Sequence, residues 1–393
     1  MTLSSAEMFN HLSESRTVVI NDKARSLIEQ GKDVINLGGG EPDFDTPHNI
    51  IKIAEEAMKE GKTHYVSSPG IPKLREEIVV KLRDVDNCNY DESQIIVTPG
   101  GKLALYIALM SVVNSGDEVI VVNPAWVSYE PLITMVGGKA VYVSLNQKDN
   151  FTLKGQLIAD VCTAKTRAII INTPNNPTGR VLKQEEIAEL RKVAEEHNLI
   201  VISDEVYDRL TYGVNKFISV ASDPELLQRT ITVQSFSKGY AMTGWRLGYL
   251  ALPKELCNAA LKAQQHMMTC TTSFVQIAGI EALKNSEEVF RMKDRYDERL
   301  DFVVESLNKI PGVKCEKPEG AFYVFPEIDF KDFNSYQLAE YLLDEVGVAV
   351  TPGEAFGPEY KKNIRMSCAN SDEMLQEAMK RMTKALSKKL NKV

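Results

Sequence analysis

Short runs of apolar residues alternate with stretches of helical periodicity through the middle of the chain. The periodicity predicts helices at Lys102–Val113 and Lys183–His197, between runs that predict strands. The run from Ala168 to Ile171 is apolar at every position, as is typical of a strand in a parallel sheet covered by helices on both faces. We therefore predict an α/β fold with a mostly parallel, seven-stranded sheet. The predicted strands are Ile95–Thr98, Val119–Asn123, Ala140–Leu145, Ala168–Asn172, Leu199–Ser203, Thr230–Val233 and Gly248–Leu252.

The pattern changes beyond about Lys284, where charged helices alternate with very short strand signals. This mixture predicts a smaller α+β domain. Because no repeat or low-complexity linker separates the two parts, we expect them to pack closely. We place the large domain at residues 48–285 and the small domain at 1–47 together with 286–393. The elements expected in the second part are helices at Ser286–Lys309, Ser335–Val346 and from Ser371, and strands at Ala321–Phe325, Gly347–Thr351 and Asn363–Ser367.

The composition describes an ordinary globular protein, with 393 residues, 44% of them hydrophobic and 25% charged. A net charge of −8 argues against a nucleic-acid binder, because phosphate contacts need a basic face. The first residues, Met1–Glu14, lack the apolar core of a secretion signal. No apolar run approaches the roughly 18 residues of a membrane span, so we expect no membrane partner.

Cysteine and histidine usage narrows the chemistry further. The six cysteines form no C-x-x-C pair, which favours reduced thiols and predicts a cytoplasmic protein. The five histidines lie far apart and show no metal-ligand spacing. Metal catalysis is therefore not supported by the sequence.

The segment Ser235–Tyr249 contains the most informative lysine of the chain. Lys238 follows an apolar strand beside Ser235 and Ser237, with Arg246 eight positions later. A lysine withdrawn from water can lose its proton and act as a nucleophile. Hydroxyls and a guanidinium are suitable donors for a phosphate dianion. Although a single lysine is usually a solvated surface residue, this combination suggests a Schiff-base site for pyridoxal phosphate.

Glycines and amides also follow predicted strands, where ligands bind in open α/β sheets. Gly100 and Gly101 open the helix that contains Lys102, so backbone N–H groups there could approach an anion. Asn176 lies in a dense turn cluster after the strand at 168–172 and could present its amide to an oxygen. Alternatively, the two glycines could form a simple tight turn, and the segment around Asn176 could be a loop without a binding role. A Walker A loop is excluded, because Lys102 is followed by Leu103 and not by serine or threonine, and position 96 is not glycine.

Other strand ends carry an acid and aromatic residues. Asp204 could keep a pyridine nitrogen protonated, and Tyr207 could reach the phenolate oxygen of the same ring. Alternatively, Asp204 could cap a helix and Tyr207 could be a packing residue. Trp126 could stack on a planar ring or pack in the core. Arg365 could clamp an α-carboxylate or form a surface ion pair. Because all these residues are parts that one cofactor needs, we favour a single site.

With these residues in place, the chain resembles the class I/II pyridoxal-phosphate aminotransferases of fold type I. It is most similar to the aspartate aminotransferase subgroup common in bacteria and archaea, over nearly the whole length. The set of motifs in this order is highly specific. The matching segments are Leu37–Pro47, Tyr65 with Gly70–Arg75, Asn175–Gly179, Ser203–Tyr207, Ser235–Gly248 and Asn363–Ser367.

The resemblance implies how the cofactor is held. Lys238 would form the Schiff base and then shuttle the substrate proton. Asp204 would pair with the pyridine nitrogen, Asn176 and Tyr207 would contact the phenolate oxygen, and Trp126 would stack on the ring. The resemblance also implies a homodimer, because one phosphate ligand comes from the second subunit. The implied phosphate ligands are Gly100, Gly101, Lys102, Ser235, Ser237, Arg246 and the second subunit's Tyr65.

The resemblance implies substrates as well. Arg365, with Asn176 and the backbone at Gly40, would bind the α-carboxylate, and Trp126 would border it. Thr17 and Lys102 match positions that help bind a side-chain carboxylate, which favours aspartate and glutamate with 2-oxoglutarate or oxaloacetate as acceptors. Aromatic amino acids or prephenate stay open as alternatives, and so does a pyridoxal-phosphate lyase on the same scaffold.

Overall fold

A seven-stranded sheet forms the centre of the molecule, in the strand order β2-β8-β7-β6-β5-β3-β4. The structure is a computed structural model that describes residues 5, 9, 12, 16–285, 287–329 and 333–390; the side chains of residues 16–21 and 388–390 lie outside the description. Strand β8 runs in the direction opposite to the other six strands of this sheet. The predicted α/β fold with a mostly parallel sheet is confirmed. The strands are β2 (Ile95–Thr98), β3 (Glu118–Asn123), β4 (Lys139–Ser144), β5 (Thr166–Asn172), β6 (Ile200–Asp204), β7 (Thr230–Ser235) and β8 (Gly248–Ala251).

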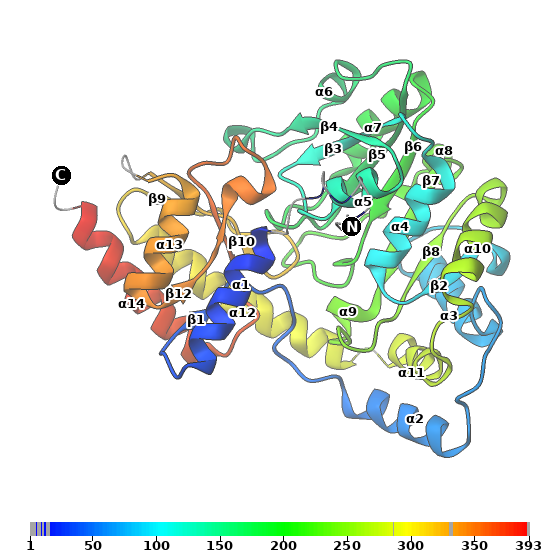
Figure 1. The fold of residues 1–393 in the computed structure, drawn as a ribbon, viewed down its shortest axis with the longest axis horizontal. Helices are drawn as coiled ribbons and strands as arrows, with labels where there is room; N and C mark the ends of the chain where they lie inside the picture. Colours follow the sequence, from blue (N-terminus) through cyan, green and yellow to red (C-terminus); the bar gives the residue numbers. More distant parts are fainter. Residues whose placement is uncertain are drawn as a thin grey trace, which may run out of the picture.

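Helices cover both faces of the sheet, as its all-apolar strands predict (Figure 1). One face of alternate residues, such as Val119 and Ile170, packs against α4, α5 and α10. Residues pointing the other way, such as Ile120 and Ile169, pack against α6, α7 and α8. The helices of this region are α2 (His48–Lys59), α3 (Pro72–Asp84), α4 (Gly101–Val112), α5 (Tyr129–Met135), α6 (Gly155–Ala159), α7 (Gln184–Glu196), α8 (Pro224–Leu227), α9 (Phe236–Gly239), α10 (Lys254–Met268) and α11 (Ser273–Lys284).

A second lobe combines the start and the end of the chain, at the left of Figure 1. Strand β1 pairs in parallel with β12, which brings the segment after α1 beside α13 and α14. The elements are α1 (Arg16–Glu29), β1 (Ile35–Asn36), α12 (Glu287–Asn308), β9 (Val313–Lys314), β10 (Tyr323–Val324), β11 (Glu327–Ile328), α13 (Ser335–Val346), β12 (Val348–Ala349), β13 (Thr351–Pro352), β14 (Ile364–Ser367) and α14 (Asp372–Leu390).

The predicted elements of this lobe form with small shifts. The helix predicted from Ser286 begins at Glu287, and Ser286 itself lies outside the described residues. The single strand predicted at Gly347–Thr351 is divided into β12 and β13, because its two ends pair with different partners, β1 and β14. No helix among the described residues is long and apolar enough to cross a membrane.

One hydrophobic cluster joins the two lobes. It contains Leu74 and Val97 beside the sheet and Tyr296 and Leu342 in the second lobe, each at most 1% exposed. The lobes therefore share a core, which agrees with the close packing that the sequence predicts. The domain division at residues 47/48 and 285/286 stays a prediction.

Candidate active site

A cavity of about 300 Å³ lies where the parallel strands of the sheet end. The segments that follow β2, β3, β5, β6 and β7 all contribute to its wall, because parallel strands place their carboxyl ends at the same edge. Residues from the second lobe close it from the other side. The lining residues are Gly38, Gly40, Gly101, Lys102, Leu105, Trp126, Tyr129, Asn172, Asn176, Asp204, Val206, Tyr207, Ser235, Ser237, Lys238, Thr243, Arg246, Tyr323 and Arg365.

Lys238 enters the cavity from the short helix α9. Ser235 caps this helix, its hydroxyl accepting a hydrogen bond from the Ser237 backbone N–H at 3.1 Å. The Lys238 ammonium donates to the Gly40 carbonyl. Burial lowers the pKa of Lys238 to about 8; nearby arginines, Arg365 among them, lower it too, while acidic neighbours work in the opposite direction. At a pH slightly above neutrality a substantial fraction of this amine is therefore unprotonated and nucleophilic.

A cradle for an anion surrounds the start of α4. Gly100 precedes the helix with a φ of +85°, and a Cβ added there would lie 2.5 Å from the Arg246 Nη2 atom. Glycine is therefore favoured by the backbone conformation, and an added Cβ would displace the guanidinium from its place beside the turn. The Gly101 and Lys102 N–H groups belong to the first turn, whose donors lack partners within the helix. The hydroxyls of Ser235 and Ser237 lie 2.9 Å apart on the cavity wall.

Asp204 is the last residue of β6 and is buried, with 3% of the residue exposed. Its Oδ2 atom accepts a hydrogen bond from the Tyr129 hydroxyl at 2.7 Å. Among the described residues, no lysine, arginine or histidine forms an ion pair with it. Burial raises its pKa to about 6, although the Tyr129 hydroxyl lowers it. A cationic group bound in the cavity would compensate this buried acid.

Arg365 is a buried cation in the complementary situation. It lies in β14, is 4% exposed, and forms no ion pair with a carboxylate of the described part of the chain. Its guanidinium donates to the Asn176 side-chain oxygen at 3.1 Å and to the Gly38 carbonyl at 2.6 Å, whereas Nε has no hydrogen-bond partner among the described residues. The guanidinium also lies 4.5 Å from the centre of the Tyr323 ring. An anion entering the cavity would supply the missing charge.

The aromatic residues of the cavity are held by neighbours. Trp126 meets the Tyr129 ring edge-on at 5.5 Å between centroids, and the Lys102 ammonium lies 4.9 Å from the indole centre. The hydroxyl groups of Tyr207 and Tyr323 are 2.9 Å apart. Burial raises the Tyr207 pKa well above its usual value, so its hydroxyl keeps the proton that it can donate.

Most predicted site residues converge on this cavity, and the remaining ones are accounted for separately. Gly100 forms the turn behind the wall. Tyr65 is 85% exposed, away from the cavity of its own chain. The side chain of Thr17 lies outside the described residues.

Sequence reasoning assigned no role to Tyr129 or Tyr323, both of which line the cavity. Tyr129 lies almost one helical turn after Trp126, so its direction could have been inferred had the start of α5 been predicted. Tyr323 lies in a predicted strand, but its contact with Tyr207 joins the two lobes. The sequence near either residue does not predict a contact between side chains that are 116 positions apart.

A lysine and an acid at the strand ends of the central sheet, faced by an arginine from the second lobe, are the site of an α/β enzyme centred on an amine nucleophile. The model of the family "Aminotransferase class I and II" matches residues 32–382. The chain belongs to the class I and II aminotransferases, and enzymes of this kind use pyridoxal phosphate. The protein is therefore a pyridoxal-phosphate-dependent aminotransferase.

Similar proteins are known from sequence and from solved structures. An aspartate aminotransferase of Musicola paradisiaca is 41% identical over 390 residues, 98% of this chain and 97% of its own. A probable aspartate/prephenate aminotransferase of Aquifex aeolicus is 42% identical, over 97% of this chain and 98% of its own. The structure of Thermus thermophilus aspartate aminotransferase with maleate matches with a TM-score of 0.93 at 36% identity, covering 98% of this chain and all of that one.

Proposed function

We propose that the protein moves the α-amino group between aspartate or glutamate and the oxo acids 2-oxoglutarate and oxaloacetate, in two successive half-reactions. The observation that carries this proposal is that the wall of one cavity contains two cations, Arg365 and Lys102, in addition to Lys238 and Arg246, which we assign to the cofactor. A dicarboxylic amino acid has one carboxylate for each. The names of the similar aspartate aminotransferases support the same substrates.

The buried charges of the cavity fit pyridoxal phosphate. Asp204 would hold the protonated pyridine nitrogen, which supplies the missing partner of a buried carboxylate. The start of α4, with Ser235, Ser237 and Arg246, would hold the phosphate, since helix N-termini favour anions. Tyr207 and Asn176 would donate to the phenolate oxygen, and Trp126 would stack on the ring.

When bound, the cofactor would supply an aldehyde group that condenses with an amine, and an electron-accepting ring. Arg365 orients the substrate by binding its α-carboxylate in a bidentate manner. Fixing that group leaves the Cα–H bond as the one directed toward Lys238. The Lys238 amine would then act as general base by taking the proton from the substrate Cα. It would act as general acid by returning a proton at the C4′ atom of the cofactor.

Lys102 would bind the side-chain carboxylate of the substrate. Partial burial, followed by the charge of Arg246, lowers the pKa of Lys102, and an incoming carboxylate would relieve that repulsion. Thr17 would assist it. We also propose that the protein is a cytoplasmic homodimer in which Tyr65 reaches the phosphate bound by the second subunit. Its exposure of 85% in the single chain supports this arrangement.

A kinetic panel tests the substrate assignment. With 2-oxoglutarate as acceptor, we expect kcat/KM to be highest for aspartate, when aspartate, phenylalanine and alanine are compared as donors. Lys102→Met removes this cation and should reduce kcat/KM for aspartate by about tenfold, as expected for the loss of a charged contact. The kcat/KM for phenylalanine should stay nearly unchanged. A clear preference for alanine would contradict the two-cation account.

A second candidate function is transamination of aromatic amino acids or prephenate. The aromatic side chains in the cavity wall, Trp126 and Tyr323, favour it, and an aromatic aminotransferase of Pyrococcus horikoshii has a similar structure, with a TM-score of 0.88 and 40% identity. It covers 93% of this chain and 99% of its own. Adding phenylalanine with oxaloacetate, and prephenate with glutamate, to the same panel measures this activity directly. Release of ammonia without an acceptor would instead indicate a lyase.

A further inference from the structure

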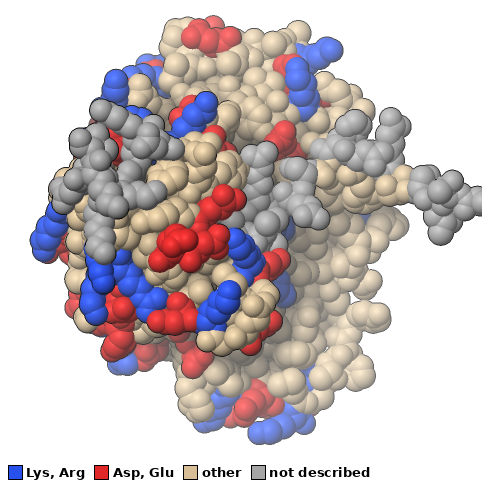
Figure 2. Space-filling view, turned by 60° about the vertical axis from the view of Figure 1, so that its left-hand side comes forward, with Lys and Arg blue, Asp and Glu red and all other residues tan. Residues whose placement is uncertain are grey.

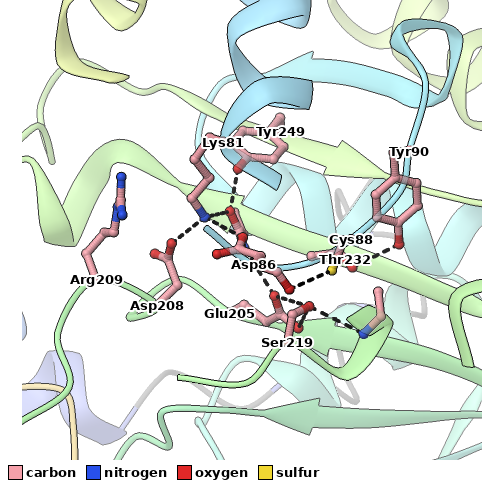
Figure 3. Close-up of polar contacts among 12 residues, drawn as sticks. Lys81, Asp86, Cys88, Tyr90, Glu205, Asp208, Arg209, Ser219, Thr232 and Tyr249 are labelled. Carbon is pink, nitrogen blue, oxygen red and sulfur yellow. Dashed lines mark hydrogen bonds and ion pairs between the residues drawn. The ribbon is translucent and has the colours of Figure 1, made fainter. Parts of the chain in front are cut away.

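A cluster of buried polar side chains outside the active-site cavity joins α3 to the neighbouring strands β6, β7 and β8; most of its members are drawn in Figure 3. Every member is at most 8% exposed, and none lines the cavity. Burying this many polar groups is costly unless each finds its partners. The back-face cluster consists of Lys81, Asp86, Glu205, Asp208, Gln234 and Tyr249.

The cluster is connected to the cavity through neighbours in the sequence. Successive residues of an extended chain point to opposite sides. Gln234 therefore points into the cluster, whereas the next residue, Ser235, faces the cavity. In the same way Asp204 faces the cavity, and Glu205 points into the cluster. Tyr207 also lines the cavity, and the next residue, Asp208, reaches the cluster from the turn that follows β6.

Gln234 is the centre of the cluster, because its amide bonds in four directions. Its oxygen accepts from the Lys81 ammonium at 2.5 Å and from the Tyr249 hydroxyl. Its nitrogen donates to Asp86 at 2.9 Å and to Glu205 at 3.1 Å. Strand β7 is thereby tied to α3, β8 and the end of β6 at once.

Glu205 continues the pairing of β6 with β7 beyond the last residues of the backbone ladder. That ladder ends with the pair Asp204–Val233, followed by the bond from the Glu205 N–H to the Val233 carbonyl at 2.9 Å. The next link is the side-chain bond between Glu205 and Gln234. The opposite carboxylate oxygen of Glu205 is held by the Ser203 and Ser219 hydroxyls at 2.8 and 2.9 Å and by the Val220 N–H at 3.1 Å.

Lys81 supplies positive charge to the cluster. Its ammonium contacts Asp86 at 2.6 Å and Asp208 at 2.5 Å. Burial works to lower its pKa, but the two carboxylates raise it well above the usual value, so Lys81 stays charged. The position of Asp208, next to Tyr207, is fixed by this cation.

We propose that Glu205 is a positioning residue of the aminotransferase, which through Gln234 sets the distance between the strand end that carries Asp204 and the one that carries Ser235 and Lys238. The inference rests on the proposed function, because it assumes that these two ends hold opposite parts of pyridoxal phosphate. A small change in their separation would misalign the ring with the amine, and misplacements of about 1 Å cost on the order of a hundredfold in rate.

The contacts of Glu205 suit the ionised carboxylate, which is the form that prevails at pH values above its raised pKa of about 7. One oxygen of Glu205 faces a backbone N–H, at Val220, and the other faces the amide N–H of Gln234. A glutamine in either orientation would bring its own NH₂ group against one of these donors. Glu205→Gln therefore keeps the shape of the side chain but breaks the link between β6 and β7 or the link to Val220.

The test compares wild type and Glu205→Gln at pH 8. We expect the dissociation constant for pyridoxal phosphate, followed by quenching of tryptophan fluorescence, to rise about tenfold, the lower end of the effect of lost supporting contacts. We expect kcat to fall by a similar factor, while KM for the amino donor changes less than about twofold, because Arg365 lies outside the cluster. A purely structural role would lower stability without this division between kcat and KM.

A milder pair of variants decides the matter if Glu205→Gln does not fold. Ser219→Ala removes a hydroxyl that donates to Glu205 at 2.9 Å. Ser222→Ala removes a hydroxyl of the short helix that Ser219 caps, Val220–Ser222; within the described part of the chain this hydroxyl donates to the Ser219 carbonyl and not to Glu205. We expect Ser219→Ala to weaken cofactor binding about threefold, as for one lost hydrogen bond, and Ser222→Ala to leave it unchanged.

The outcomes separate this inference from the proposed function. Wild-type affinity and kcat in folded Glu205→Gln or in Ser219→Ala would overturn the positioning role alone, and so would an equal loss in Ser222→Ala. A wild-type protein that bound no pyridoxal phosphate would overturn the proposed cofactor site and the positioning role with it. A loss confined to KM would also overturn the positioning role.

Discussion

At the scale of single residues, the cavity owes its chemistry to ionisable groups that are withdrawn from water and form no ion pair within the described part of the chain. Burial lowers the pKa of Lys238 to about 8 and raises that of Asp204 to about 6. Both shifts favour the neutral form of the group. The residues are therefore prepared for a cofactor that reacts with a free amine and brings a cationic nitrogen of its own.

The Lys238 pKa leads to a prediction for cofactor uptake. The rate constant at which cofactor-free protein takes up pyridoxal phosphate should rise with pH as the amine loses its proton and level off above about pH 9. Stopped-flow absorbance over pH 6–10.5 measures it. A rate that keeps rising to about pH 10.4, the usual lysine value, would show that the environment of Lys238 does not lower its pKa.

Glu205 leads to a prediction for stability. Burial, and then the charge of Asp86, raises its pKa to about 7 in the folded protein. Because the folded state binds this proton more tightly than the unfolded chain, with its ordinary value of about 4.3, the stabilisation is complete below pH 4 and is lost as pH rises through 7. The Tm of cofactor-free wild type should therefore fall relative to that of Glu205→Gln between pH 5 and pH 8. A constant difference in Tm would contradict the raised pKa.

At the scale of elements, the site is built where strands end and helices begin. The sequence predicts every strand of the central sheet, because apolar runs and their punctuation are local signals. It does not predict that β6 and β7 extend to Asp204 and Ser235. Those ends are set by pairing with neighbouring strands, as in the pair Ser235–Gly248.

The same limit explains which site residues sequence reasoning could assign. Lys238 and Arg365 are recognisable because a cation in an apolar segment is unusual. Gln234 and Glu205 gave no such signal, since their meaning comes from contacts with α3 and with the segment after β6. Glu205, directly beside Asp204, could have been suspected from its place at the end of a buried strand.

The turn before α4 offers a test at this scale. Gly100→Ala would place a Cβ at a φ of +85°, 2.5 Å from Arg246, so we expect the affinity for pyridoxal phosphate to fall by tenfold or more, about 1.4 kcal/mol or above. Gly116→Ala is the matched control, because Gly116 has a φ of +88° and nothing within 4 Å of its added Cβ. Equal loss of affinity in both variants would show that backbone strain, and not the Arg246 contact, is responsible.

At the scale of the whole molecule, the two lobes meet at the cavity and share a core. Arg365 comes from the second lobe and bonds to Asn176 of the sheet region at 3.1 Å. Figure 2 shows the second lobe from outside, with acidic and basic side chains interspersed over it. A substrate bound at Arg365, as proposed, would therefore lie at the contact between the lobes.

Assembly is the prediction that belongs to this scale. We expect sedimentation equilibrium to give twice the chain mass of 43.9 kDa, and Tyr65→Phe to weaken binding of pyridoxal phosphate without changing that mass. The physical reason is the loss of one hydroxyl donor to phosphate across the subunit boundary. A monomer with full cofactor affinity would contradict the shared site.

The central claim is that Lys238 carries the cofactor. The most direct measurement is reduction of the protein with borohydride after incubation with pyridoxal phosphate, followed by peptide mass spectrometry. We predict one stoichiometric adduct, on Lys238, and none in Lys238→Ala. An unmodified Lys238 peptide, or an equal adduct on another lysine, would contradict the account.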